Sequence, residues 1–166
     1  MRIRICAVGK AKGGPEATLA AEFLSRADKA GRSLGFRGAA LTECEAPPAA
    51  RRADPAARKA AETKALLEQV SDQARIVALD LGGECWSSEK MAEKLAQWRD
   101  DGIGEAAFLI GGADGLDRAA TAAADCVIAF GRATWPHMLV RAMAAEQIYR
   151  CMTILAGQPY HRRGRP

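Results

Sequence analysis

The residues best suited to chemistry lie in the last third of the chain, from Phe108 to Arg163. Both histidines, His137 and His161, fall in this stretch. Imidazole titrates near neutral pH and can exchange a proton with a substrate. Arg141 lies here too, and its fork of donors suits a phosphate or a carbonyl oxygen. The stretch therefore offers proton transfer and anion recognition, although a salt bridge is an equally good interpretation of Arg141.

A helix is expected at 137–154, and it would carry several of these groups. His137, Arg141 and Ala145 recur every four residues and so share one helical face. Pro136 suits the first turn of a helix, which predicts Thr134 or Trp135 as the cap. A histidine at a helix start is more typical of a structural hydrogen bond than of a catalytic base.

Three glycine-bearing segments, 79–83, 111–115 and 131–136, each follow an apolar, strand-like run. Ligands bind outside the carboxyl ends of parallel strands, and glycine lets a ligand approach the backbone closely. The order G-G-x-x-G at 111–115 is not the dinucleotide fingerprint, and the two glycines at 13–14 lack the ending of a phosphate loop. Alone, the glycine pattern also fits a plain tight turn.

Strand-like and helix-like patterns alternate along the whole chain, which predicts the elements that position these segments. Strands are expected at 2–8, 36–44, 75–80, 106–110 and 126–130. Helices are expected at 15–30, 55–72, 88–100, 116–124 and 137–154. Such alternation indicates an α/β fold, with a mainly parallel sheet covered by helices on both faces. We expect one domain, spanning 1–166.

The composition excludes several classes of protein. Of 166 residues, 49% are hydrophobic and 27% charged, which is globular. No apolar run approaches the roughly 20 residues that span a bilayer, and the alternating N-terminus indicates a first strand rather than a signal peptide. Five scattered cysteines without a C-x-x-C pair argue against a zinc site or a disulfide framework. We therefore expect a cytoplasmic protein without a bound metal.

Charge is distributed unevenly. The net charge is +4, but residues 84–131 carry four basic against nine acidic side chains, whereas residues 132–166 carry six basic against one acidic. Basic charge at one end of a chain suits a polyanionic partner such as RNA. An ordinary solvated surface explains the same numbers equally well.

Taken together and in order, four motifs resemble one known family. They are Ile110-Gly111-Gly112-x-x-Gly115-Leu116, Pro136-His137-x-Leu139-Val140-Arg141, Glu146-Gln147-x-Tyr149-Arg150 and Pro159-Tyr160-His161-Arg162. The chain is similar to the bacterial pseudouridine N3-methyltransferases of large-subunit ribosomal RNA, which belong to the SPOUT class. The likeness covers essentially the whole chain, with Met138 standing where the family usually has proline.

The resemblance implies a SPOUT fold with a C-terminal trefoil knot, a homodimer, and S-adenosyl-L-methionine held where the subunits meet. It also implies a partner, 23S ribosomal RNA, with a single pseudouridine as the methyl acceptor. The residues expected to bind the cofactor are Leu79, Gly111, Gly112, Gly131, Arg132, Ala133, Thr134, Trp135 and Pro136.

The same resemblance assigns the catalytic groups. Arg141 is expected to hold the substrate, and Tyr160 and His161 to complete the site from the tail. His137 and Arg162, with Arg141, are expected to bind the RNA. The imide N–H of pseudouridine must lose a proton, so a base or a group that stabilises the anion is required. His161 is a candidate base, but an anchoring role for it stays open.

Two other functions stay open. One is a basic binding module associated with the ribosome and lacking activity; it predicts no affinity for the cofactor. The other is a nucleotide-dependent enzyme with an open doubly wound sheet, which the missing fingerprints disfavour. Since the chain forms one compact domain, we further expect the enzyme to act on an assembled ribosome.

Overall fold

The computed structural model describes residues 1–45 and 48–162. Five strands form one sheet in the order β2-β1-β4-β3-β5, and every neighbouring pair is parallel. The strands are β1 (Arg2–Val8), β2 (Ala39–Cys44), β3 (Arg75–Glu84), β4 (Glu105–Ile110) and β5 (Cys126–Ile128). All six residues of the central strand β4 are buried. The mainly parallel sheet expected from the sequence is thus confirmed.

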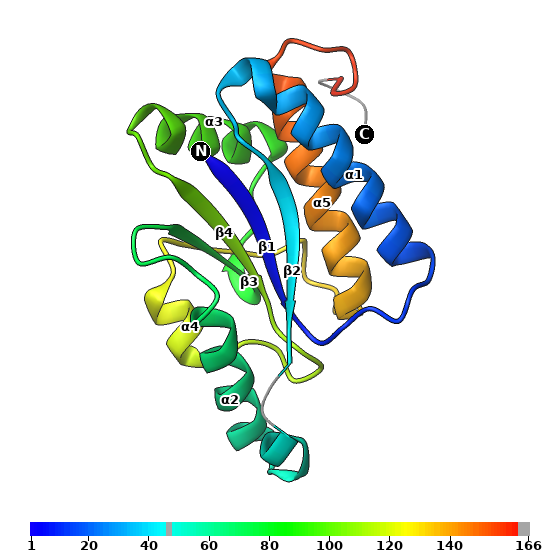
Figure 1. Ribbon diagram of the computed structural model, residues 1–166, viewed down its shortest axis with the longest axis vertical. Helices are drawn as coiled ribbons and strands as arrows, with labels where there is room; N and C mark the ends of the chain where they lie inside the picture. Colours follow the sequence, from blue (N-terminus) through cyan, green and yellow to red (C-terminus); the bar gives the residue numbers. More distant parts are fainter. Residues whose placement is uncertain (46–47, 163–166) are drawn as a thin grey trace.

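Helices cover both faces of this sheet (Figure 1). The helices are α1 (Pro15–Gly31), α2 (Pro55–Leu67), α3 (Ser88–Asp100), α4 (Arg118–Ala123) and α5 (His137–Leu155), with 3-10 turns η1 (Arg32–Leu34) and η2 (Pro48–Arg52). Alternate residues of β1 contribute to two separate cores. Ile3 and Ile5 pack in the core that contains α1, α3 and α5 residues, whereas Cys6 and Val8 pack with α2 and α4 residues.

Several element boundaries differ from those expected. Strand β3 continues to Glu84, although the glycines at 82–83 were expected to end it, because its last residue pairs again with β5. Helix α2 ends at Leu67 rather than 72, and β2 begins at Ala39 rather than 36. Helix α4 begins only at Arg118, because the side chain of Asp117 caps it.

The pairing of β3 with β5 is unusual. Ile128 on β5 pairs with Leu79 and again with Glu84, so β3 bends around the end of β5. A Cβ at Gly83 would lie 2.6 Å from the backbone of Ile128, so only glycine fits there. The end of β5 is thus flanked by two parts of β3, one on each side of the bend in β3. The trefoil knot expected from the resemblance stays a prediction.

Two further expectations concern membranes and cysteines. Within residues 1–45 and 48–162, no helix has the length and apolarity that crossing a membrane requires. All five cysteines are free; Cys6, Cys44 and Cys151 are buried and Cys85 is exposed.

Candidate active site

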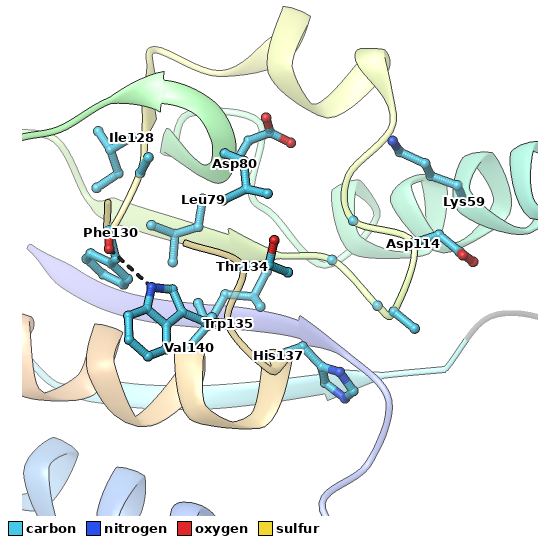
Figure 2. A pocket seen from close by; sticks show the side chains of 17 residues that line it. Lys59, Leu79, Asp80, Asp114, Ile128, Phe130, Thr134, Trp135, His137 and Val140 are labelled. Carbon is cyan, nitrogen blue, oxygen red and sulfur yellow. Dashed lines mark hydrogen bonds between the residues drawn. The ribbon is translucent and has the colours of Figure 1, made fainter. Parts of the chain in front are cut away.

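A pocket of about 360 Å³ lies where the carboxyl ends of β3, β4 and β5 meet the start of α5 (Figure 2). This size suits a small organic ligand. Its walls are built from the three glycine-bearing segments singled out in the sequence. The lining residues are Lys59, Leu79, Asp80, Leu81, Ile110, Gly111, Gly112, Ala113, Asp114, Gly115, Ile128, Ala129, Phe130, Thr134, Trp135, His137 and Val140.

The turn after β4 forms the tightest wall. The amide of Gly115 donates to the carbonyl of Gly112 at 3.1 Å, closing the turn, and Gly115 has a φ of +80°. A Cβ on Gly111 would lie 2.4 Å from the carbonyl carbon of Gly115. No side chain fits in that space, so the turn leaves its backbone bare toward the pocket.

Helix α2 supports this turn from behind. The amide of Asp117 donates to Thr63 Oγ1 at 2.9 Å, and Arg58 Nε donates to Asp114 Oδ2 at 2.7 Å. Glu62 packs so closely that a Cβ on Gly112 would lie 2.6 Å from its Oε2, which is buried without a hydrogen-bond partner among the described residues. Burial, and then the nearby charge of Asp114, raise the pKa of Glu62. The turn is therefore held by several contacts at once.

The loop between β5 and α5 closes another side. Trp135 Nε1 donates to the carbonyl of Phe130 at 3.2 Å, drawn as a dashed line in Figure 2. Gly131 adopts a φ of +101°, which turns the chain. Helix α5 begins at His137 with Pro136 itself at the cap position, so the expectation that Thr134 or Trp135 caps this helix was wrong. Proline carries no side-chain acceptor, and no side chain caps the helix.

His137 is the one imidazole that lines the pocket. Burial, and then the charge of Arg141, lower its pKa from the ordinary 6.5, so the ring is neutral at pH 7. Among the residues that the structure describes, none forms a hydrogen bond with this ring. The pocket therefore contains a neutral imidazole that is available to a ligand. Lys59, Asp80 and Asp114 add charged groups to its lining.

Only some of the residues that the sequence predicts to bind the cofactor line the pocket. Leu79, Gly111, Gly112, Thr134 and Trp135 line the pocket. Gly131, Arg132, Ala133 and Pro136 belong to the same loop but do not line it. These four residues position the loop, and their role toward a cofactor stays a prediction.

Arg141 lies elsewhere. Its side chain is 2% exposed and points to the ends of β1 and β2 rather than into the pocket. Nη1 donates to Glu43 Oε1 at 2.7 Å, and Nη2 donates to the carbonyls of Val8 and Gly9 at 2.5 and 2.9 Å. Both terminal nitrogens of the guanidinium thus have protein acceptors.

Tyr160 and His161 lie at the opposite end of α5, which at 1.5 Å per residue is about 28 Å long. Tyr160 Oη donates to Glu146 Oε1 at 3.0 Å. The guanidinium of Arg150 lies over the Tyr160 ring. His161 Nε2 lies 2.9 Å from Glu89 Oε1. Bonds from its own backbone, from His161 and from Ser87 lower the pKa of Glu89 to about 2.

Arg162 follows these tail residues and is exposed. Within a single chain, the tail residues expected at the site are therefore far from the pocket. No group of three His, Cys, Asp or Glu side chains that could hold a metal occurs in the described part of the chain.

Sequence reasoning missed some of the lining. Lys59 comes from α2, which carries no motif, and only the fold brings it beside the glycine turn. Val140 was not among the predicted site residues, yet it lies three residues after His137 on α5 and lines the pocket. The position of Val140 at i+3 from His137 was the one available signal.

Comparisons with known proteins agree with one another. A family described as "Predicted SPOUT methyltransferase" matches residues 1–161. Proteins named ribosomal RNA large subunit methyltransferase H from Bradyrhizobium diazoefficiens and Methylocella silvestris are each 48% identical over 162 residues, covering 98% of this chain and 99% of each relative. The protein of that name from Beijerinckia indica is 50% identical over the same shares.

Proposed function

Since the chain belongs to the SPOUT methyltransferase family, we propose that it transfers a methyl group from S-adenosyl-L-methionine to 23S ribosomal RNA. The relatives that match nearly its full length are named ribosomal RNA large subunit methyltransferase H. The observation that carries the proposal is a pocket at three strand ends, lined by three glycines and by His137, whose ring forms no hydrogen bond with another described residue.

The pocket fits the cofactor. The cavity has a volume of about 360 Å³, and Gly111, Gly112 and Gly115 line it without side chains, so a ligand can approach the backbone there. Backbone amides and carbonyls at Leu79, Gly112 and the loop before α5 can recognise the edge of an adenine. When bound, the cofactor supplies a methyl group already activated on a sulfonium. The protein's main task is then to position the acceptor.

The acceptor we propose is N3 of a pseudouridine. This imide nitrogen must lose its proton before or during transfer. His137 lines the pocket with a lowered pKa and a free ring, so it can accept a hydrogen bond or that proton from the base. This gives His137 a more direct role than Arg141, whose terminal nitrogens have protein acceptors.

We further propose that the active unit is a homodimer. Leu81 and Trp135 line the pocket, yet they are 57% and 42% exposed, which is unusual for large apolar side chains. A second protomer over the pocket would cover them. It would also let the Tyr160 and His161 of one chain serve the pocket of the other. A monomer by light scattering at micromolar concentration would contradict this arrangement.

The decisive experiment uses radiolabelled S-adenosyl-L-methionine and ribosomes from cells that lack the modification. We expect label in a single pseudouridine of 23S RNA, with far less transfer to naked RNA, which would identify the assembled ribosome as the substrate. Equal transfer to naked RNA would contradict the ribosome as substrate. No transfer and no cofactor binding by calorimetry would favour the rival, a ribosome-associated binding module without activity.

A further inference from the structure

The buried contacts of Arg141 connect α5 to a loop that carries two lysines. We call residues 9–14, which join β1 to α1, the lysine loop. Arg141 Nη2 donates to the carbonyl of Gly9 at 2.9 Å, at the first residue of this loop. Glu43 Oε1 accepts from Arg141 Nη1 and also from the amide of Ala11, at 2.7 and 2.8 Å. A single carboxylate thus links α5 to the middle of the loop.

The beginning of the lysine loop is held from both sides. The amide of Gly9 donates to the carbonyl of Cys44 at 2.7 Å, while its own carbonyl accepts from Arg141. Gly9 has a φ of +86°, a conformation that turns the chain away from β1. Because the backbone is held at Gly9 and Ala11, the directions in which the side chains of Lys10 and Lys12 leave the backbone are constrained as well. Lys10 and Lys12 are both exposed.

The lysine loop lies close to the first turns of α5 through its contact with Arg141, although none of its residues lines the pocket. Figure 2 shows the chain after β1 passing next to His137, which lies one helical turn before Arg141. The loop itself contains no acidic residue, and Glu43 beneath it is already paired with Arg141. Lys10 and Lys12 form no ion pair with another described residue, so both ammonium groups are available near the start of α5.

We propose that Lys10 and Lys12 contact phosphates of the RNA next to the target nucleotide, and that Arg141 and Glu43 are positioning residues for this loop. Ammonium contacts with phosphates fix the register of a nucleic acid without reading its sequence. S-adenosyl-L-methionine contains no phosphate, so the phosphates that these lysines would contact belong to the RNA. Arg141 acts on the substrate through the loop rather than by touching it. This inference rests on the proposed function, because it needs an RNA substrate.

The first test replaces both lysines. For Lys10→Ala/Lys12→Ala we expect the KM for ribosomes to rise about tenfold, with kcat and the cofactor dissociation constant unchanged. Loss of two phosphate contacts should also make the plot of log affinity against log salt shallower by about 1.5 to 2. The matched control is Lys29→Ala/Lys64→Ala, which removes the same charge from exposed positions on α1 and α2 and should leave KM unchanged.

The second test asks whether Arg141 and Glu43 act through the loop. Glu43→Gln keeps the shape of the side chain but weakens its bond to Arg141, so KM should rise about threefold to tenfold. Added to Lys10→Ala/Lys12→Ala, it should cause little further increase, because coupled residues are not additive. If Glu43→Gln folds poorly, Ala11→Pro removes the amide that donates to Glu43, also restricts the backbone at Lys10, and should raise KM in the same way.

The outcomes separate the two proposals. Co-sedimentation with ribosomes measures the RNA contact without methyl transfer. If wild-type protein binds ribosomes through the lysine loop but transfers no methyl, the proposed function fails and the contact stands. If it transfers methyl and the double lysine variant behaves like its control, the lysine contact is overturned. Full additivity with Glu43→Gln would overturn the positioning role of Arg141.

Discussion

The two ends of α5 are built in opposite ways. At its N-terminal end, His137 and Val140 line a pocket that is closed on one side by a glycine turn, in which Gly111 tolerates no Cβ. At its C-terminal end, Tyr160 and His161 are held by side chains, through Glu146 and Glu89. The backbone of the glycine turn fixes the shape of that wall independently of side-chain rotamers. Partly exposed polar contacts are weak and can exchange for others.

The difference indicates separate tasks for the two ends. The pocket end is preorganised, as a site that must orient a small cofactor requires. The tail end is attached by contacts that another surface could replace at small cost. Each of the following variants tests one side of this contrast.

Gly111→Ala should have the largest effect. Its Cβ would lie 2.4 Å from the carbonyl carbon of Gly115, and backbone at both positions cannot yield without opening the turn. We expect a loss of about 1–3 kcal/mol in the free energy of unfolding, with cofactor affinity reduced about 100-fold. Thermal melts and calorimetry measure both. Gly104→Ala is the matched control, because nothing lies within 4 Å of its Cβ. Equal behaviour of the two variants would refute a rigid turn.

Gly112→Val should affect binding more than folding. The new side chain would meet Glu62 on α2, behind the turn, and would push the turn toward the pocket unless Glu62 moves. We expect cofactor affinity to fall at least about tenfold by calorimetry. Combining the milder Gly112→Ala with Glu62→Ala should restore part of the binding that Gly112→Ala loses. Unchanged affinity in Gly112→Val would show that the cofactor binds elsewhere.

His137 makes a prediction about pH. Its folded-state pKa is lowered below 6.5, so the unfolded chain takes up a proton first as the pH falls. Stability should therefore be full above about pH 6.5 and decline as the pH drops toward the folded pKa. Cofactor affinity should decline in the same window by about threefold to tenfold, because a protonated ring repels the sulfonium. His137→Asn should bind the cofactor independently of pH between 5.5 and 7.5, roughly the range of imidazole titration, whereas His161→Asn should keep the dependence.

Tyr160→Phe should have the smallest effect on the isolated protein. It removes one 3.0 Å hydrogen bond to Glu146, which keeps its ion pair with Arg150. We expect the free energy of unfolding to change by less than about 1 kcal/mol and cofactor affinity to stay the same. Methyl transfer to ribosomes should nevertheless fall if the tail completes the site. A large loss of stability would contradict the weak attachment inferred for this end.

Much of the fold was predictable because local pattern and tertiary structure agree. The alternation in β1 and the buried run of β4 follow from side-chain chemistry alone. The extension of β3 through Gly82 was not predictable, since it depends on pairing with β5, about 45 residues later in the chain. The glycine segments at the strand ends allowed the pocket to be predicted, because glycine lets a ligand approach the backbone and the same residues line the pocket. The placement of Lys59, and the burial of Arg141 against Glu43, required the fold.

The most direct test of the central claim, that both ends of α5 serve one site across a dimer, is complementation. Gly112→Val and Tyr160→Ala/His161→Ala chains would be co-expressed with different tags, and the mixed dimer purified through both. Each parent dimer should be inactive on ribosomes. The mixed dimer has one intact pocket paired with one intact tail, so it should recover about half of the wild-type rate. An inactive mixed dimer, with cofactor still bound at the intact pocket, would contradict a shared site.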